Sequence, residues 1–404
     1  MFPKLRFKEF DENWKEVTLK NCITSIDSGW SPQCESYPAN SSEWGVLKTT
    51  SVDWSGFNSS FNKKLPLELT PRKEIEVKPL DILVTRAGPT ERVGVVSVVP
   101  HSVRSKLMIS DKLIRLKSNE ENNPLFLGIS LSSVKCQNQL QSKTSGLAKS
   151  QTNISQKILG EVLLKLPSKE EQTKIASFLS AVDEKISQLT KKHELLSQYK
   201  QGMMQKLFSQ QLRFKADDGS EFGEWEDKKL GEISKTFSGG TPQSSNKSFY
   251  EGTIPFIKSG EISKNTTEQC INDLALEKSS AKLVKKGDLL YALYGATSGQ
   301  VAISQIDGAI NQAVLCIRSE LNTKYLLNFL LLKKEEILTT YLQGGQGNLS
   351  ASILKEIYIP TPCLAEQTKI ANFLSAIDQK IEVVAQQIEQ AKTWKKGLLQ
   401  QMFM

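Results

Sequence analysis

Apolar residues recur every three or four positions along two stretches of the chain, residues 168–210 and 362–404. In the first stretch the repeating positions are Ile175, Leu179, Val182, Ile186, Leu189, Leu196, Met203 and Leu207. In the second they are Ile370, Leu374, Ile377, Ile381, Val384, Ile388, Ala391, Leu398 and Met402. This rhythm, kept without proline and with charges on the other faces, predicts two long coiled-coil helices. A proline precedes each stretch and glutamates occupy the first turns, as helix starts prefer.

Two lysines interrupt the apolar seam at corresponding positions, Lys200 and Lys395. Each side chain could carry its charge into water at a fraying helix end. Alternatively, polar seam residues fix the register and the partner of a helix at some cost in stability. The pattern alone leaves both interpretations open.

The two helical stretches are copies of each other. Residues 171–186 return 195 positions later as residues 366–381, and 13 of these 16 positions are identical. A repeat of this length exceeds the period of solenoids and propellers. We therefore interpret the chain as two copies of a whole module, each ending in the same helix.

The residues ahead of each helix predict mixed α/β modules of about 150 residues. Short β-rich runs separated by Gly, Pro and Ser suggest antiparallel or barrel-like sheet at 81–85, 93–99, 112–116, 288–292, 300–304 and 313–318. We expect a helix at about 324–338 and a weaker one at about 124–135. The predicted domains are 1–167, 168–210, 211–361 and 362–404.

The modules resemble each other less than the helices do. Their shared points are Leu-Arg-Phe-Lys at 5–8 and 212–215, Trp14 and Trp225, and short phrases at 28–33 and 238–243, 47–49 and 257–259, and 153–155 and 348–350. Near-identical helices joined to divergent modules are expected if the helices bind one kind of partner twice while the modules read different targets.

Bulk properties narrow the class of protein. The chain has 404 residues, 39% of them apolar and 24% charged, which suits two ordinary soluble domains. No apolar run approaches the length of a membrane helix, and the N-terminus lacks the apolar core of a signal peptide. Six widely spaced cysteines favour a reduced, cytoplasmic protein.

Charge is uneven between the two modules. Residues 1–167 carry 23 Lys and Arg against 17 Asp and Glu, a net charge of +6. Residues 211–360 carry 17 against 18, a net charge of −1. A positive first module suits a polyanionic partner, whereas any DNA-binding face of the second module must be local.

The motifs of catalysis are missing from the sequence. The segment Gly-Ala-Thr-Ser-Gly at 295–299 begins and ends with glycine, but it lacks the lysine and the following helix of a phosphate-binding loop. Two histidines and scattered cysteines predict no metal site. An Asn/Asp-Pro-Pro-Tyr motif is also absent. We therefore predict no catalytic residues and a non-catalytic protein.

At this point the residues resemble a known family. The Leu-Arg-Phe-Lys phrase with Trp14, the Gly-x-Thr-Pro turn at 239–242, the phrases at 346–350 and 357–362, and the Glu-Gln-Thr-Lys-Ile-Ala start of both helices are similar to the specificity subunits of type I restriction–modification systems. The resemblance covers nearly the whole chain. The first module departs from it by carrying Gly-Trp-Ser-Pro at 29–32.

The resemblance implies an α+β fold, with two mixed α/β target-recognition domains each followed by a long helix. It implies that the two helices pair as an antiparallel coiled coil with pseudo-twofold symmetry. It also implies double-stranded DNA as a partner, read as a bipartite target, together with two modification (methyltransferase) subunits and restriction (motor/nuclease) subunits. S-adenosylmethionine, ATP and Mg²⁺ would bind those partner subunits, and this chain would hold no cofactor.

Loops rather than strands should carry DNA contacts, because loops can differ while the scaffold is kept. Arg suits guanine, Asn and Gln suit adenine, and Lys and Thr suit phosphates. On this basis we predict DNA contacts at Lys48, Thr49, Arg86, Thr90, Arg92, Lys143, Thr144, Lys149, Lys258, Ser259, Tyr294, Thr297, Gln300, Gln346 and Asn348. For partner docking we predict the helix seam at Ile175, Leu179, Val182, Ile186, Leu189, Lys200, Ile370, Leu374, Ile377, Ile381, Val384 and Lys395.

The helix length adds a geometric expectation. Roughly 39 helical residues at about 1.5 Å rise span near 58 Å, and two turns of B-DNA measure about 68–72 Å. Paired helices of this length could hold two recognition domains over grooves more than one turn apart. The helices would then act as a ruler that sets the unread spacer.

Two other classes of function remain as alternatives. One is a methyltransferase or nuclease with fused recognition domains, which the missing motifs oppose. The other is a protein-interaction scaffold without DNA reading, or a DNA-mimic inhibitor. The basic first module opposes mimicry, and salt-sensitive DNA binding would oppose the scaffold.

Overall fold

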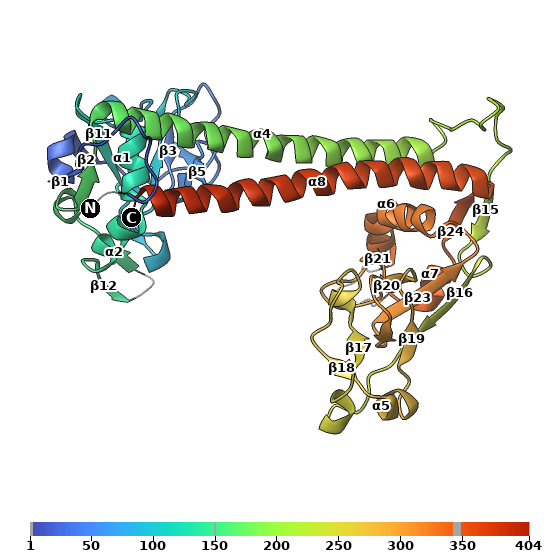
Figure 1. Cartoon of the computed structure of the whole chain (residues 1–404). Coiled ribbons are helices and arrows are strands. Elements are labelled where there is room, and N and C mark those ends of the chain that lie inside the picture. Colours follow the sequence, from blue (N-terminus) through green and yellow to red (C-terminus); the bar gives the residue numbers. More distant parts are fainter. Residues whose placement is uncertain (1–2, 149–150, 342–348, 404) are drawn as a thin grey trace. The chain divides into compact units, whose positions relative to one another are not determined.

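The computed structural model describes residues 3–148, 151–341 and 349–403. The chain forms two compact units, each built around one module. Unit 1 contains residues 1–188 and 388–404, and unit 2 contains residues 189–387. The two predicted long helices are α4 (Lys169–Phe208) and α8 (Leu364–Met402), labelled in Figure 1. Each unit therefore holds parts of both helices.

These units differ from the predicted division into modules and separate helices. The reason is that the first turns of each helix belong to the core of the module before it. Ile175, Ala176, Leu179 and Val182 pack in the core of unit 1 with strands of the first module. In unit 2, Ile370, Ala371, Leu374 and Ile377 pack in the same way.

The main sheet of each unit has four antiparallel strands in the same order. In unit 1 the order is β2 (Ile23–Ser28), β11 (Leu113–Ser118), β7 (Ile82–Thr85) and β9 (Val96–Val98). In unit 2 it is β16 (Ser234–Ser238), β23 (Val314–Ser319), β20 (Leu289–Ala292) and β21 (Val301–Ile303). All six predicted β-rich runs lie in these sheets, and the predicted antiparallel pairing is confirmed.

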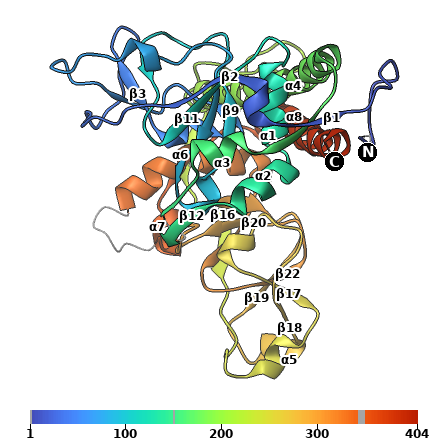
Figure 2. The ribbon, with the colours of Figure 1, turned by 90° about the vertical axis from the view of Figure 1, so that its left-hand side faces the viewer.

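A smaller sheet in each unit contains a parallel pair that the sequence did not predict. In unit 1 the order is β10 (Leu107–Met108), β3 (Gly45–Leu47) and β6 (Asn62–Lys64), with β3 parallel to β10. In unit 2 it is β18 (Cys270–Ile271), β17 (Ile254–Ile257), β22 (Gly308–Ile310) and β19 (Lys282–Val284), with β17 parallel to β22. In unit 2 this sheet gathers with α5 (Asp273–Glu277) away from α6 (Thr323–Tyr341), as Figures 1 and 2 show.

Short strands join the beginning of each module to its end. β1 (Lys15–Thr18) pairs with β14 (Leu163–Leu166), and β15 (Glu226–Lys229) pairs with β24 (Tyr358–Thr361). Unit 1 also has the hairpin β4 (Val52–Asp53) with β5 (Gly56–Phe57), and the sheet β12 (Ser145–Ala148), β13 (Gln151–Asn153) and β8 (Ala87–Gly88). These closing pairs bring each module's last strand directly to the start of its long helix.

The predicted weak helix at 124–135 is in fact two helices, α1 (Pro124–Leu131) and α2 (Val134–Gln141). The break occurs because the Ser133 hydroxyl accepts a hydrogen bond from the Cys136 amide and starts a new helix. The helix predicted at 324–338 is α6, which extends slightly beyond both ends. α3 (Gln156–Gly160) and α7 (Ala351–Lys355) are single turns before β14 and β24. No helix in the described part of the chain is long and apolar enough to cross a lipid bilayer.

Candidate functional site

A buried carboxylate holds the start of α4 against the N-terminal segment of unit 1. Glu171 has a side chain that is 1% exposed, and it accepts two hydrogen bonds of 2.7 Å from the Arg6 guanidinium. The Trp14 indole N–H donates to the same carboxylate at 3.3 Å. A carboxylate that is buried with charge-assisted donors is stable only while those donors remain. Arg6, Trp14 and Glu171 thus form an anchor between two segments that are far apart in sequence.

Unit 2 contains the same anchor. Glu366 is fully buried and accepts hydrogen bonds of 3.1 and 2.8 Å from Arg213. The Trp225 indole N–H donates to Glu366 at 2.9 Å. The Leu-Arg-Phe-Lys phrases, the two tryptophans and the repeated glutamates therefore have a structural role inside each unit. Contacts within the chain explain this part of the repeat without an external partner.

The next residue in each copy links the helix start to the helix that covers the main sheet. The Gln172 side chain donates to the Pro167 carbonyl and accepts from the backbone N–H of Asn123 at the start of α1. The Gln367 side chain donates to the Pro362 carbonyl and accepts from the backbone N–H of Asn322 at the start of α6. Each glutamine therefore fixes two helix starts relative to each other.

The seam lysines form the same ion pair in both units. In unit 2, Lys200 of α4 lies 2.7 Å from the Asp378 carboxylate of α8. In unit 1, Lys395 of α8 lies 2.5 Å from the Asp183 carboxylate of α4. Both aspartates belong to the repeated phrase, so the two helices exchange roles from one unit to the other. The structure therefore favours lysines that fix register over lysines that extend into water.

The apolar residues of the predicted seam are largely buried. Ile175, Leu179, Val182, Leu189, Ile370, Leu374, Ile377 and Val384 are buried, and Ile186 and Ile381 are partly buried. Their docking of partner subunits stays a prediction. Partner contacts on these helices must use side chains other than these buried ones.

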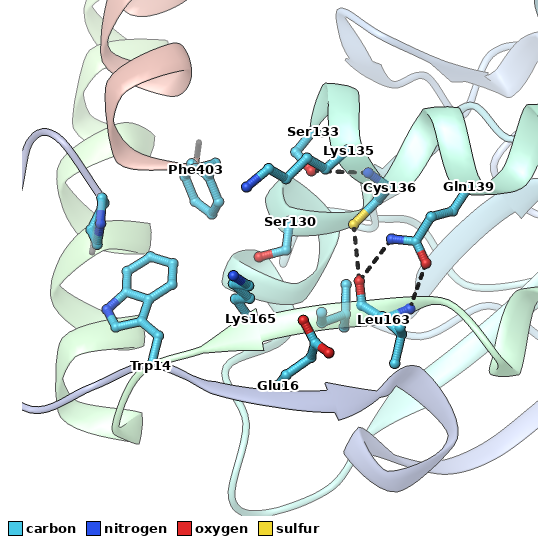
Figure 3. Close-up of a pocket in the computed structure, with 12 residues that line it drawn as sticks. Trp14, Glu16, Ser130, Ser133, Lys135, Cys136, Gln139, Leu163, Lys165 and Phe403 are labelled. Carbon is cyan, nitrogen blue, oxygen red and sulfur yellow. Dashed lines mark hydrogen bonds between the residues drawn. The ribbon is translucent and has the colours of Figure 1, made fainter. Parts of the chain in front are cut away.

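Unit 1 has a small cavity beside the end of α8, with a volume of about 160 Å³. Figure 3 shows the Trp14 and Phe403 rings on one side and Ser130, Cys136 and Gln139 on the other. The Ser130 hydroxyl is buried and has no hydrogen-bond partner among the described residues. The cavity is therefore apolar on one wall and has an unsatisfied polar atom on the other.

Comparison with unit 2 explains this cavity. Phe208 corresponds to Phe403 by the 195-residue offset, and it packs against Phe329 with ring centroids 5.4 Å apart. Phe329 lies four residues after Tyr325, as Ser130 lies four residues after Phe126. Phe126 and Tyr325 pack against the equivalent rings of Phe403 and Phe208. The cavity exists because a serine in unit 1 takes the place of a phenylalanine in unit 2.

The cavity has no arrangement suited to nucleophilic chemistry. Burial raises the pKa of the Cys136 thiol, whose Sγ donates to the Leu163 carbonyl at 3.9 Å, and a raised pKa opposes formation of the nucleophilic thiolate. No histidine lies among the residues that line it. Within residues 3–148, 151–341 and 349–403, no group of three or more His, Cys, Asp or Glu side chains could hold a metal ion.

In unit 1 the structure brings together three of the residues predicted to contact DNA, Lys48, Thr49 and Arg92. Lys48 follows β3, and the Thr49 carbonyl accepts a hydrogen bond of 3.3 Å from Arg92. The Arg92 guanidinium also lies 2.5 Å from Asp53 and 2.8 Å from the Val52 carbonyl. Arg92 therefore supports the β4–β5 hairpin, and its predicted contact with a base stays a prediction.

The other predicted residues of the first module lie in separate places. The Arg86 backbone pairs with Lys112 and Ile154, and the Thr90 hydroxyl lies 2.7 Å from that of Thr152. Lys143 is exposed and lies 3.8 Å from Glu161. The Thr144 hydroxyl donates to the Gln141 carbonyl at 2.9 Å. Lys149 lies outside the described residues, as do Gln346 and Asn348 of the second module.

In unit 2 the predicted residues lie around the end of the small sheet. Lys258 and Ser259 directly follow β17, and a Cβ placed on Gly260 would lie 4.0 Å from the Thr297 methyl group. Burial raises the pKa of the Tyr294 phenol, and a hydrogen bond with Gln312 opposes that shift. Gln300 is exposed just before β21. Lys258, Ser259, Tyr294 and Thr297 thus come from different segments to one region.

Sequence reasoning missed the residues that complete this region. Thr241 of the Gly-x-Thr-Pro turn donates to the Gln312 side chain at 2.6 Å. Lys247, Gln269 and Asn311 line a groove next to Lys258. The signal that could have found them is the turn itself, because a glycine, a hydroxyl residue and a proline recur at 29–32 and 239–242. Its position beside the parallel strands could not be read from sequence.

Both units are built on one scaffold, and in each unit the core of the module includes the first turns of a long helix. The chain belongs to the family of the type I restriction modification DNA specificity domain, whose sequence model matches residues 12–197 and 223–393. The predicted resemblance is thereby confirmed, and so is the α+β class with two recognition domains and long helices. The family is one of non-catalytic specificity subunits.

Individual relatives agree with this assignment. The chain is 40% identical over 171 residues to the type I restriction enzyme EcoEI specificity subunit of Escherichia coli, a match covering 42% of this chain and 29% of that protein. It is 27% identical over 413 residues to the putative type I restriction enzyme MjaX specificity subunit of Methanocaldococcus jannaschii, covering 98% and 94% of the two chains.

The fold is also found in a solved structure. The type I restriction-modification system S subunit from M. genitalium superposes with a TM-score of 0.64 at 17% identity, over 100% of this chain and 99% of that chain. At this identity the likeness concerns the fold alone. The shared fold extends over both modules and both long helices.

Proposed function

We propose that this chain is the DNA sequence-recognition subunit of a type I restriction–modification complex. Each unit would read one half of a bipartite DNA target, and the catalytic centres would lie in partner subunits. The observation that carries this proposal is the repetition of one scaffold with different side chains at the same edge. Identical anchors with divergent edges are what two readers of different sequences require.

The partners follow from this proposal. Two modification (methyltransferase) subunits would dock on the exposed faces of α4 and α8, and restriction (motor/nuclease) subunits would join them, in the cytoplasm. S-adenosylmethionine, ATP and Mg²⁺ would bind to those subunits. A base that is methylated must leave the helical stack to reach a partner's active site. This chain would position the DNA for that step.

Mapping of methylated adenines across the host genome tests the proposal. In cells with the chain, the methylated adenines should lie in a recognition sequence of two parts separated by an unread spacer. Cells without the chain should lack methylation at that sequence. Exchange of residues 211–361 for the matching module of a relative should change one half of the recognition sequence and leave the other half intact. A single uninterrupted recognition sequence, or methylation that persists without the chain, would refute the proposal.

A second experiment tests the role of the helices as a ruler. One heptad is inserted into α4 near residue 192 and one into α8 near residue 387. Seven residues add about 10.5 Å of helix, which corresponds to about three base pairs of B-DNA. We expect the spacer to lengthen while both half-sites stay the same. The matched control is a seven-residue insertion in the exposed turn at 217–220, which should not change the spacer.

A further inference from the structure

The small sheet of unit 2 ends at an edge where several polar side chains meet. β17 and β22 are parallel, with Phe256 opposite Ala309 and Ile257 opposite Ile310. Their carboxyl ends therefore lie side by side and lead into Lys258 and Asn311. Ligands of sheets with parallel strands commonly bind at the carboxyl ends of those strands.

A groove of about 420 Å³ lies at this edge. Its lining residues share hydroxyl, amide, ammonium or aromatic side chains, and none is a carboxylate: Thr241, Ser244, Lys247, Tyr250, Phe256, Lys258, Gln269 and Asn311. Lysine, threonine, serine and amide side chains are the groups that proteins direct at DNA phosphates.

The two lysines of the groove are available to an anion. Neither Lys247 nor Lys258 forms an ion pair with another described residue. The Glu261 carboxylate accepts hydrogen bonds from the backbone amides of Lys258 and Glu268, and its residue is 5% exposed. Because residues 211–360 have a net charge of −1, these lysines provide a local positive region in a module without a general one.

The wall of the groove is held firmly. A Cβ on Gly239 would lie 1.7 Å from the Ile310 carbonyl oxygen, so the turn at 239–242 packs directly on the end of β22. The Tyr250 hydroxyl donates to the Pro242 carbonyl at 2.7 Å. The groove therefore keeps its shape without a ligand, which lowers the entropic cost of binding.

Unit 1 has the counterpart of this edge. β3 and β10 are parallel, and Lys48 follows β3 as Lys258 follows β17. A Cβ on Gly29 would lie 1.8 Å from the Ile109 carbonyl oxygen, the same close approach as at Gly239. Lys48 also forms no ion pair within the described part of the chain. One lysine at this edge is thus common to both units.

We propose that Lys247 and Lys258 hold the phosphate backbone of the DNA half-site read by unit 2, and that Lys48 is the unit 1 counterpart of Lys258. This inference rests on the proposed function, because it assigns the partner of that function to one groove. Phosphate contacts fix the register of a protein on the duplex but carry no sequence information. These lysines therefore position the DNA, and neighbouring side chains read it.

The test measures DNA affinity of the reconstituted complex with its methyltransferase partners, for the variant Lys247→Gln/Lys258→Gln. Loss of two phosphate contacts should make the slope of log K against log salt shallower by about 1.8. Affinity should fall equally for the target duplex and for a duplex with the unit 2 half-site scrambled. The variant Lys247→Arg/Lys258→Arg should keep the wild-type slope, because it keeps both charges.

The matched control is Lys285→Gln/Lys286→Gln. These exposed lysines precede β20 and follow β19, at the opposite end of the small sheet, and the control removes the same charge. We expect it to leave the slope unchanged. The inference is overturned if the groove variant has the slope of the control, or if it loses discrimination between the two duplexes. If the wild-type complex itself shows no preference for the target duplex, the proposed function fails as well, so the two failures are distinguishable.

Discussion

The two units share their scaffold and differ at one edge. Both have the Arg–Glu–Trp anchor, the glutamine between two helix starts, and the same strand order in the main sheet. At the carboxyl ends of the parallel strands, however, unit 1 has Trp30 where unit 2 has Gly240. Arg72 lies over the Trp30 ring at 4.2 Å, and no such pair occupies the turn of unit 2.

The neighbouring polar pair differs as well. In unit 1 the Ser31 hydroxyl contacts the Asp111 carboxylate, and in unit 2 Thr241 donates to the Gln312 amide. A carboxylate suits the amino group of cytosine, whereas an amide suits adenine. The anchor interactions are thus the same in both units, while the chemistry presented at the edge differs. Predictions about the anchors and the helix ion pairs should therefore give the same result in both units.

The largest expected effect concerns the anchors. Glu171→Ala and Glu366→Ala each leave a half-buried arginine and an indole N–H without the carboxylate that they share. Breaking a buried ion pair from one side costs about 3–5 kcal/mol. We expect a loss of this size from the unit that holds the variant, and a similar value in both units. Hydrogen exchange of the strand amides, measured unit by unit, checks the prediction; a loss below about 1 kcal/mol in either unit would contradict it.

The next prediction separates the units. Asp81 and Asp288 precede equivalent strands, and each accepts a hydrogen bond of 2.8 Å from a backbone amide three residues earlier. Burial raises the pKa of Asp81, outweighing Arg115 at 3.6 Å. Burial is also the largest single influence on Asp288, but the bidentate hydrogen bonds from Arg318, the hydrogen bond from the Lys285 amide and the Arg318 charge together outweigh it and lower the pKa. The same position thus has opposite shifts in the two units.

The stability contributions of these aspartates should therefore have opposite pH dependence. That of Asp288 is present above its unfolded pKa and is lost as pH falls through its lowered folded pKa. That of Asp81 is present below its unfolded pKa and is lost as pH rises through its raised folded pKa. At pH 7, Asp288→Asn should cost about 1.5–3 kcal/mol, and Asp81→Asn should cost little or stabilise. Denaturant unfolding of both variants at pH 7 and pH 4 measures this, and equal costs at pH 7 would refute it.

A smaller effect is expected at the cavity of unit 1. Ser130 has a buried hydroxyl without a described partner, so Ser130→Ala should cost nothing and should gain up to about 1 kcal/mol. The control is Ser132→Ala, because the Ser132 hydroxyl donates to the Gly128 carbonyl at 2.9 Å and its loss should destabilise. Thermal unfolding of the two variants compares them directly. A destabilised Ser130→Ala would show that the hydroxyl has a partner, such as a bound water.

The smallest effect concerns the ion pairs between the helices. Partly exposed pairs contribute about 0.2–1 kcal/mol. A double-mutant cycle on Lys200 and Asp378 should give a coupling energy in this range, and the cycle on Lys395 and Asp183 should give a similar value. The reversed pair Lys200→Asp/Asp378→Lys should recover most of the stability that either single change removes. A coupling energy of zero in both units would show that the two lysines extend into water and do not fix the register of the helices.

Much of the scaffold could be predicted from sequence because it repeats. The two long helices begin and end within two residues of the predicted bounds, since their heptads and flanking prolines are strong local signals. The six β-rich runs can be predicted because apolar and polar residues alternate in them or because most of their residues are apolar. The Ser132–Ser133 break between α1 and α2 was missed, because a serine inside an apolar run gives a weak cap signal.

The edge could be predicted only in part. Lys48 and Lys258 are predicted from the shared phrases at 47–49 and 257–259, and the structure places each directly after a strand of the parallel pair; their DNA contacts stay predictions. Lys247, Gln269 and Asn311 are not predicted, because three separate segments bring them to the edge. Asn311 follows β22, whose parallel partner β17 lies more than 50 residues earlier, and Gln269 precedes β18, the antiparallel neighbour of β17. Arg92 shows a further limit: the sequence does not reveal that its guanidinium pairs with Asp53, and its DNA contact stays a prediction.

The reciprocal lysine–aspartate pairing makes the two long helices alike in charge. Each long helix carries one aspartate near its beginning and one lysine near its end, and each lysine pairs with the aspartate of the other helix. A shift of one helix along the other would therefore break the pair in each unit.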